Sequence, residues 1–147
     1  MPMYCRNELI ITGLRKNIIS FIVNNTGENN YLDFDKAIST DLLDEKQEML
    51  PASDIKLYVK KKDKWERISD EVINKYLNDT LNKLIKEDFV SVNYNFVTRY
   101  SSPNGWLKLI SYIYPRLLFE AVICDEDDNA NAFYHYNNGR EIRLDEN

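Results

Sequence analysis

Alternating hydrophobic and polar side chains mark several strands along the chain. The clearest is predicted over Val90–Tyr100, where apolar and polar side chains fall on opposite faces with a period of two. The apolar face holds Val90, Val92, Tyr94, Phe96 and Tyr100, and the polar face holds Ser91, Asn93, Asn95 and Arg99. Further strands are predicted over Cys5–Thr12, Tyr31–Ile38 and Leu117–Cys124.

Two segments between these strands carry apolar side chains at helical spacing. The first has a stripe of Leu14, Ile18, Phe21 and Ile22 and ends at the breaker Asn24–Gly27. The second has a stripe of Trp106, Leu109, Ile110 and Ile113 that stops before Pro115, with Ser102 as its N-cap and Pro103 as its first residue. The chain therefore contains a strand–helix–strand unit near each end.

Two such units in tandem predict an α+β fold, a ferredoxin-like sandwich with an antiparallel sheet. In that topology the first and third core strands lie in the centre of the sheet, and helices cover one of its faces. Cys5 and Cys124 should then lie near each other as two reduced thiols. A last hairpin is predicted from Ala132–Tyr136 and Glu141–Leu144, with Asn138-Gly139 as its turn.

The middle of the chain departs from this plan. We expect a single domain over residues 1–147, in which residues 40–88 form an insertion packed on the core. Within it we predict an acidic helix over Thr40–Met49, two short strands over Ile55–Lys60 and Lys64–Ile68, and a long helix capped by Ser69. The apolar stripe of that helix is Val72, Ile73, Tyr76, Leu77, Leu81, Leu84 and Ile85.

Composition narrows the class of protein. The chain has 147 residues, 44% of them hydrophobic and 29% charged, which is typical of a soluble globular domain. Its net charge of -5 disfavours simple phosphate-driven nucleic-acid binding and docking on anionic membranes. No signal peptide or membrane-spanning stretch is evident, so we expect a cytoplasmic protein without membrane contact.

The candidate chemistry is sparse. One His and two Cys cannot supply a four-ligand Cys/His zinc site or an iron–sulfur cluster, and four glycines form neither a P-loop nor a dinucleotide fingerprint. The single histidine, His135, lies between two tyrosines in a predicted strand, where a structural role is expected. We therefore expect no enzyme activity, no metal and no cofactor.

The opening of the chain, MPMYCRNELIITG, contains Pro2, Cys5, Asn7, Leu9, Ile11 and Gly13. With these residues it resembles an uncharacterised family of phage and plasmid proteins with a YubB-type ferredoxin-like domain, in which Asn and Trp stand at the positions of Met3 and Tyr4. The segment Thr98–Pro103 and the pair Tyr114-Pro115 before an apolar strand are similar too. The family's Trp-Gly-Thr-Lys-Trp type segment is missing here. The resemblance implies a ferredoxin-like topology and a mobile-element origin.

The candidate binding residues lie on the polar face of the predicted sheet and in an acidic turn. They are Arg6, Glu8, Asn93, Asn95, Arg99 and Glu120 on the sheet, and Asp125, Glu126, Asp127 and Asp128 in the turn. The insertion helix could bury part of the polar face. The acidic turn lacks the spacing of a calcium loop, so we expect it to be solvated.

These observations favour a small non-enzymatic protein that binds a host protein, such as an inhibitor of a host defence system of the CRISPR type. The alternative is an accessory nucleic-acid-associated protein that uses the Lys-rich hairpin Lys60, Lys61, Lys62 and Lys64. RNA binding of the RRM kind is disfavoured, because the aromatic side chains of the clearest strand share its core face. An enzyme with a cleft between the insertion and the sheet is the third hypothesis.

Overall fold

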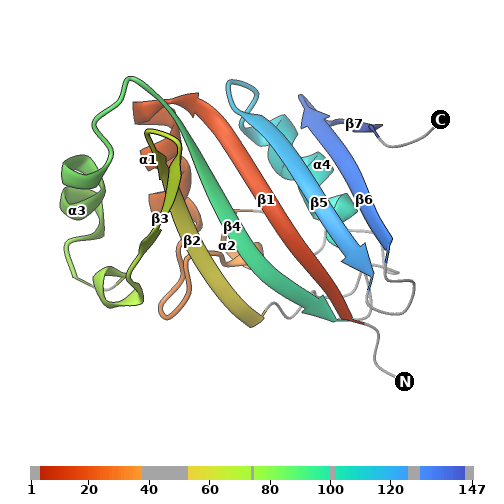
Figure 1. Ribbon diagram of the computed structural model, residues 1–147, viewed down its shortest axis with the longest axis horizontal. Helices are drawn as coiled ribbons and strands as arrows, with labels where there is room; N and C mark the ends of the chain where they lie inside the picture. The colour runs from red at the N-terminus through yellow and green to blue at the C-terminus, as the bar shows by residue number, and fades with distance from the viewer. Residues whose placement is uncertain (1–3, 38–52, 74, 100–101, 126–129, 145–147) are drawn as a thin grey trace.

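Seven antiparallel strands form one sheet in the computed structural model, which describes residues 4–37, 53–73, 75–99, 102–125 and 130–144 (Figure 1). The strands are β1 (Tyr4–Leu14), β2 (Ser53–Lys61), β3 (Lys64–Ile68), β4 (Phe89–Arg99), β5 (Leu118–Asp125), β6 (Ala130–Asn137) and β7 (Arg140–Arg143). Their order across the sheet is β3-β2-β4-β1-β5-β6-β7. The protein is thus an α+β protein, as predicted.

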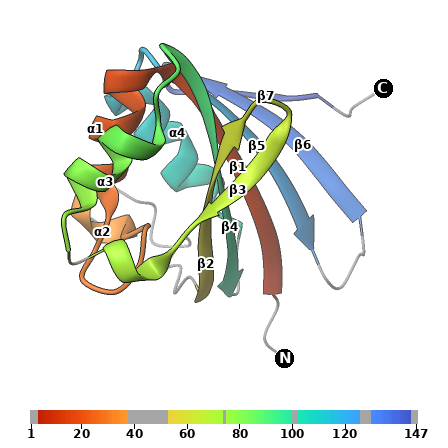
Figure 2. The same ribbon diagram turned by 60° about the vertical axis from the view of Figure 1, so that its left-hand side comes forward.

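The helices lie on one side of this sheet. They are α1 (Arg15–Asn25), α2 (Phe34–Ala37), α3 (Leu77–Leu84) and α4 (Asn104–Ile113), together with a 3₁₀ turn, η3 (Asp70–Val72). Figure 2 shows all of them beside the same face, which we call the helix face. None of the helices in the described ranges covers the other face, which we call the open face.

The two central strands, β1 and β4, have the alternation that the sequence predicts. In β1 the buried side chains are those at odd positions from Cys5 to Gly13, and they point to the helix face. In β4 the apolar residues predicted for the core face, Val90 to Phe96 at even positions, are buried. Tyr100 lies outside the described residues. Because each strand places alternate side chains on opposite faces, the core side and the open side follow directly from these two segments.

An aromatic cluster holds the helices to the sheet. The ring of Phe21 on α1 packs edge-on against Tyr94, Tyr114 and Phe119, with centroid distances of 6.1, 4.9 and 5.7 Å. Farther along the core, Phe34 lies against Phe96 and Trp106. The indole nitrogen of Trp106 donates a hydrogen bond to the carbonyl of Phe34 at 3.1 Å, so its one polar atom is satisfied.

The prediction of a strand over Tyr31–Ile38 is wrong. Tyr31 and Leu32 are buried in an irregular segment, and the short helix α2 follows. The backbone N–H of Asp33 bonds to the carbonyl of Asn25 at 2.7 Å, so this segment pairs with the end of α1 and not with the sheet. Apolar side chains in this irregular segment look like a strand in the sequence, because the pattern indicates which side chains are buried and not the backbone partner.

Residues 53–61 occupy the sheet position beside β4. The two short strands predicted within residues 40–88 are present as β2 and β3, and β2 pairs directly with β4. This part of the segment therefore belongs to the sheet itself. The helix predicted over Thr40–Met49 lies outside the described residues.

The prediction of one long helix after Ser69 is also wrong. The Ser69 side chain does accept a hydrogen bond from the Glu71 N–H, but only the 3₁₀ turn η3 follows it. Tyr76 has a left-handed backbone with φ of 59°, and α3 begins after it. Leu81 and Ile85 are fully buried, and α3 packs beside α1 on the helix face. The stripe predicts burial correctly at Leu81 and Ile85, but Tyr76 is 78% exposed and its left-handed backbone interrupts the helix.

The C-terminal hairpin and the second helical unit match their predictions closely. The turn Asn138-Gly139 joins β6 to β7 with φ of 51° and 85°, as a type I′ turn requires. Helix α4 begins at Asn104, after Pro103 at the N-cap, so the predicted Ser102 cap is wrong by one residue. Cys5 and Cys124 lie on the neighbouring strands β1 and β5, as expected, but Cys124 pairs with Arg6 and the two thiols point to opposite faces.

We predict that Phe21→Ala lowers the free energy of unfolding by about 3–5 kcal/mol, because it leaves a cavity among three aromatic rings. Leu14→Ala is the control. This side chain is 49% exposed, so its loss should change stability by less than about 1 kcal/mol. Urea unfolding followed by circular dichroism measures both, and equal effects would contradict the aromatic core as the main anchor of α1.

We predict that Gly139→Ala lowers the free energy of unfolding by about 1–2 kcal/mol. The new side chain must accept a φ of 85°, and its Cβ would lie 3.4 Å from Cβ of Tyr112. Asn138→Gly keeps a residue that accepts positive φ, so it should stay within about 0.5 kcal/mol of the wild type. Thermal unfolding of the two variants checks the turn type. A Gly139→Ala variant as stable as the wild type would show that the turn is not type I′.

Candidate binding surface on the open face

The six sheet residues predicted as contact candidates do come together on the open face. Arg6 and Glu8 lie on β1, Asn93, Asn95 and Arg99 on β4, and Glu120 on β5. Cross-strand pairing places Glu8 beside Asn95, and it places Ile10 between Asn93 and Glu120. The predicted insertion helix does not cover them, since α3 packs on the opposite side of the sheet.

A hydrogen-bonded chain of polar side chains runs through the centre of this face. The Asn93 amide donates to Glu8 Oε1 at 2.6 Å, and the Asn95 amide donates to Asn93 Oδ1 at 2.9 Å. Asn93 is only 3% exposed. Its amide therefore orients Glu8 and Asn95, and it offers little surface of its own to a partner.

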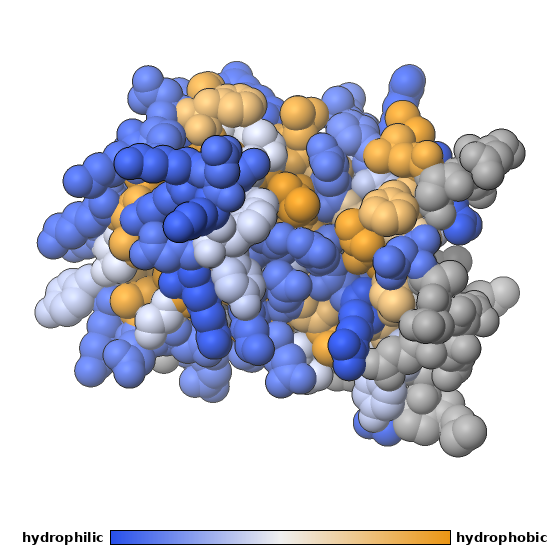
Figure 3. All heavy atoms as spheres, viewed as in Figure 1, coloured by the Kyte–Doolittle hydropathy of each residue, from blue (hydrophilic) through white to orange (hydrophobic). Residues whose placement is uncertain are grey.

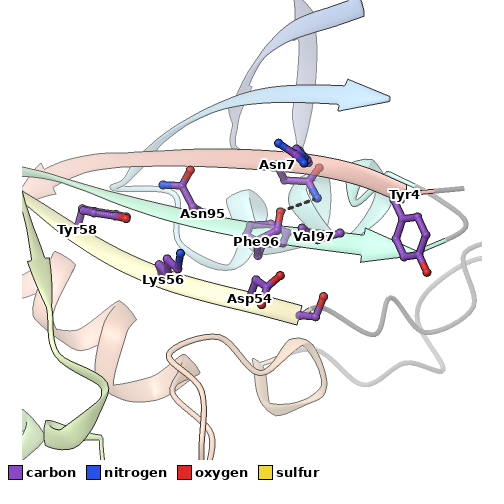
Figure 4. A pocket seen from close by; sticks show the side chains of 10 residues that line it. Tyr4, Asn7, Asp54, Lys56, Tyr58, Asn95, Phe96 and Val97 are labelled. Atoms are coloured by element: carbon purple, nitrogen blue, oxygen red, sulfur yellow. Dashed lines mark hydrogen bonds between the residues drawn. The ribbon is translucent and has the colours of Figure 1, made fainter. Parts of the chain in front are cut away.

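A pocket of about 540 Å³ opens at one end of this row of hydrogen-bonded side chains, between β1, β4 and β2 (Figure 4). It is lined by Tyr4, Arg6, Asn7, Ser53, Asp54, Lys56, Tyr58, Asn95, Phe96 and Val97. Charged and aromatic groups thus surround this hollow. We call it the bulge pocket.

A β-bulge in β2 produces this hollow. Ser53 pairs with Val97 and Lys56 pairs with Asn95, so two residues of β2 stand opposite the single residue Phe96 of β4. Asp54 takes up the extra length with a left-handed φ of 53°. A bulge bends its strand and redirects its side chains, so the regular pairing of β2 with β4 is interrupted between Ser53 and Lys56.

The open face carries an excess of positive charge. Among the described strand residues on it, the cations are Arg6, Lys56, Lys60, Arg67, Arg99 and Arg140, and the carboxylates are Glu8, Asp54 and Glu120. The whole chain has a net charge of -5. The fold therefore collects cations on one face of an acidic protein.

The lysine cluster of the β2–β3 hairpin does not form one patch. The Lys60 ammonium lies over the Trp65 ring, 5.9 Å from its centroid, on the open face. Lys61 points the other way and pairs with Glu66 at 3.5 Å. Lys62 and Lys64 are exposed at the turn. A strand alternates its side chains, so neighbouring lysines are divided between the two faces.

Apolar side chains lie on the open face as well. Phe133 and Ile142 are 42% and 53% exposed, and Ile10 and Val122 are half-buried next to them. Figure 3, which looks onto the open face, shows hydrophobic side chains among hydrophilic ones toward the β5–β7 side. A mixed surface of this kind is typical of protein interfaces, whose apolar centre is surrounded by polar groups.

The remaining predicted residues contribute less to this surface. Asp125 ends β5, and Glu126, Asp127 and Asp128 lie outside the described residues. His135 on β6 pairs in register with Glu120, so the two side chains share the open face. Over the ranges that the structure describes, no group of three or more His, Cys, Asp or Glu side chains could hold a metal ion.

The ionisable groups with perturbed pKa values lie on the helix face. Burial raises the pKa of Tyr94 well above its ordinary value, and the nearby phenols of Tyr114 and Tyr31 add to the effect. Burial raises the pKa of Tyr136 most, and the hydrogen bond to Glu141 raises it further. The Tyr136 hydroxyl donates to Glu141 Oε1 at 2.7 Å and accepts from the Asn104 amide, which joins β6, β7 and α4. The Tyr136 hydroxyl is thus hydrogen-bonded, whereas the Tyr94 hydroxyl is buried with no hydrogen-bond partner among the described residues.

Sequence reasoning missed part of the site, namely Asp54, Lys56 and Tyr58. The segment was assigned to an insertion, so its polar residues were not placed on the sheet. The signal was present, because Ile55, Leu57 and Val59 alternate with polar neighbours along β2 and are buried. The bulge itself has no such signal.

Comparison of the chain with protein-family models, with curated proteins and with solved structures finds no match. None of the helices that the structure describes is long and apolar enough to cross a membrane.

We predict that Asn93→Asp destabilises the protein at neutral pH by on the order of 1–3 kcal/mol, because it replaces a donor to Glu8 with a second carboxylate. The loss should shrink as the pH falls to about 5 and below, where the two carboxylates share a proton. Asn131→Asp, at an exposed position of β6, is the matched control and should show neither effect. Urea unfolding across this pH range tests the prediction. A pH-independent loss would show that the Asn93–Glu8 contact does not govern stability here.

Proposed function

We propose that this protein is a non-enzymatic binding protein that holds a partner protein against the open face of its sheet. The observation that carries the proposal is the asymmetry of the sheet. All described helices cover one face, and the other carries the six predicted contact residues, of which Asn93 is buried, together with exposed Phe133 and Ile142. Such a mixed, uncovered surface marks an interaction site.

The size of the face supports this role. Five of its strands contain eight or more residues, and eight residues of a strand span roughly 26 Å. Seven strands at about 4.8 Å spacing extend over roughly 30 Å. The face therefore measures on the order of 800 Å², which is the area that each partner contributes to a standard protein interface.

We also propose that the core of the fold is ferredoxin-like. The order β2-β4-β1-β5 and the connections β1–α1–β2 and β4–α4–β5 support this assignment. In both connections a helix joins two parallel strands that are separated by one antiparallel neighbour. Strand β3 and the β6–β7 pair extend the two edges.

The nature of the partner follows from the resemblance of the chain ends to the phage and plasmid family. A mobile-element origin supports a partner from the host cell, met in the host cytoplasm. We therefore propose that the partner is a host protein, such as an effector of a CRISPR-type defence system, and that this protein inhibits the effector by binding to it. Inhibition by occupancy needs a surface and no catalytic group.

We predict that the tagged protein captures a stoichiometric partner from a lysate of its bacterial host, and that Phe133→Glu with Ile142→Glu abolishes the capture. Both side chains are exposed on the open face, so the substitutions should leave the fold intact while placing charge in the interface. Tyr112→Glu is the matched control, because Tyr112 is 67% exposed on α4, on the helix side. Mass spectrometry identifies the captured protein, and equal recovery by all variants would refute the open-face assignment.

A further inference from the structure

We infer that the partner presents an acidic segment and that its carboxylates bind in the bulge pocket, between Arg6 and Lys56. The inference rests on the proposed function and specifies the chemistry of the ligand. Its basis is the charge of the open face, whose described strand residues include six cations and three carboxylates, in a chain of net charge -5. A surface that opposes the net charge of its own protein favours a partner surface of complementary sign.

The pocket is rich in hydrogen-bond donors. Lys56 on β2 pairs with Asn95 on β4, and Arg6 on β1 pairs with Val97, two residues farther along β4, so the two cations lie on either side of this end of β4. The β1 residue that pairs with Asn95 is Glu8. Asn95 gives one N–H to Asn93, and its amide has a second N–H to donate. A guanidinium has five N–H donors, so Arg6 can bind a carboxylate while it keeps its contact within the protein. The hydroxyls of Tyr4 and Tyr58 lie at the rim.

Of the described residues that line the pocket, Asp54 is the acidic one. Its position follows from the bulge, where the backbone is left-handed and Asp is one of the few residues that tolerate this conformation. Its carboxylate opposes a second anion beside it. Asp54 should therefore weaken the binding of any acidic ligand, and it should weaken a doubly charged phosphate more than a carboxylate.

The aromatic side chains of this face favour an acidic protein segment over a nucleic acid. Single-stranded nucleic acids bind by stacking bases on uncovered aromatic rings. Here Lys60 lies over the Trp65 ring, and Arg99 lies over the Tyr4 ring, each at 5.9 Å from the ring centroid. The rings hold cations in place on the surface, and these cations then face carboxylates of a partner.

The test measures binding of a fluorescein-labelled polyglutamate peptide by fluorescence anisotropy, at low salt and at about 0.15 M salt. We expect Arg6→Glu and Lys56→Glu each to weaken binding about tenfold, since each removes an attraction and adds a repulsion. We expect Asp54→Asn to strengthen it about threefold. Lys16→Glu makes the same charge change at an exposed site on α1, on the helix face, and should leave the affinity unchanged.

Three results would overturn the inference. The first is that the peptide does not bind even at low salt. The second is that Lys16→Glu lowers the affinity for the peptide as much as Arg6→Glu and Lys56→Glu do. The third is that an oligothymidylate binds more tightly than the peptide and that Arg6→Glu and Lys56→Glu abolish this binding. The last would assign the pocket to nucleic acid. Arg6→Gln and Lys56→Gln, which only remove charge, should give smaller losses in the same order, and circular dichroism checks that every variant is folded. If the host protein is captured but polyglutamate does not bind, the open-face function stands and only the acidic ligand is refuted.

Discussion

The pairing of β1 with β4 is the contact on which the rest of the structure depends. Eleven residue pairs join the two strands, from Tyr4–Arg99 to Leu14–Phe89, although more than 70 residues separate the strands in the chain. In each strand the buried apolar residues recur with a period of two, so the observed register puts both apolar sets on the same side. A shift by one residue would expose one set and bury the polar face of the other strand.

This register also decides where binding can occur. The buried sides of β1 and β4 meet Phe21, Phe34 and Trp106 from the helices, and the resulting core occupies the whole helix face. The opposite sides then have no internal element among the described residues to pack against, and they keep Glu8, Asn93 and Asn95 in a hydrogen-bonded chain. The same alternation that builds the core therefore also prepares the surface for a partner.

The bulge in β2 gives this surface its local character. Without the extra residue at Asp54, β2 would continue flat beside β4, and the open face would lack its pocket. The bulge brings Lys56 and Asp54 to the residues that the central strands supply, Arg6 and Asn95. The charge of the face thus comes from strands that lie far apart in the sequence, so an acidic chain can have an excess of cations among the described strand residues of one face.

By itself, the sequence determined the α+β class, the central strands, the face to which each of their side chains points, and the Asn138-Gly139 turn. These features depend on periods and turn residues that are local in the chain. Only the tertiary structure decided which segment pairs with β4, because Tyr31–Ile38 and Ile55–Lys60 are both apolar enough for that position. It also decided the break at Tyr76 and the bulge at Asp54, since a left-handed residue is selected by the contacts around it and leaves no period in the sequence.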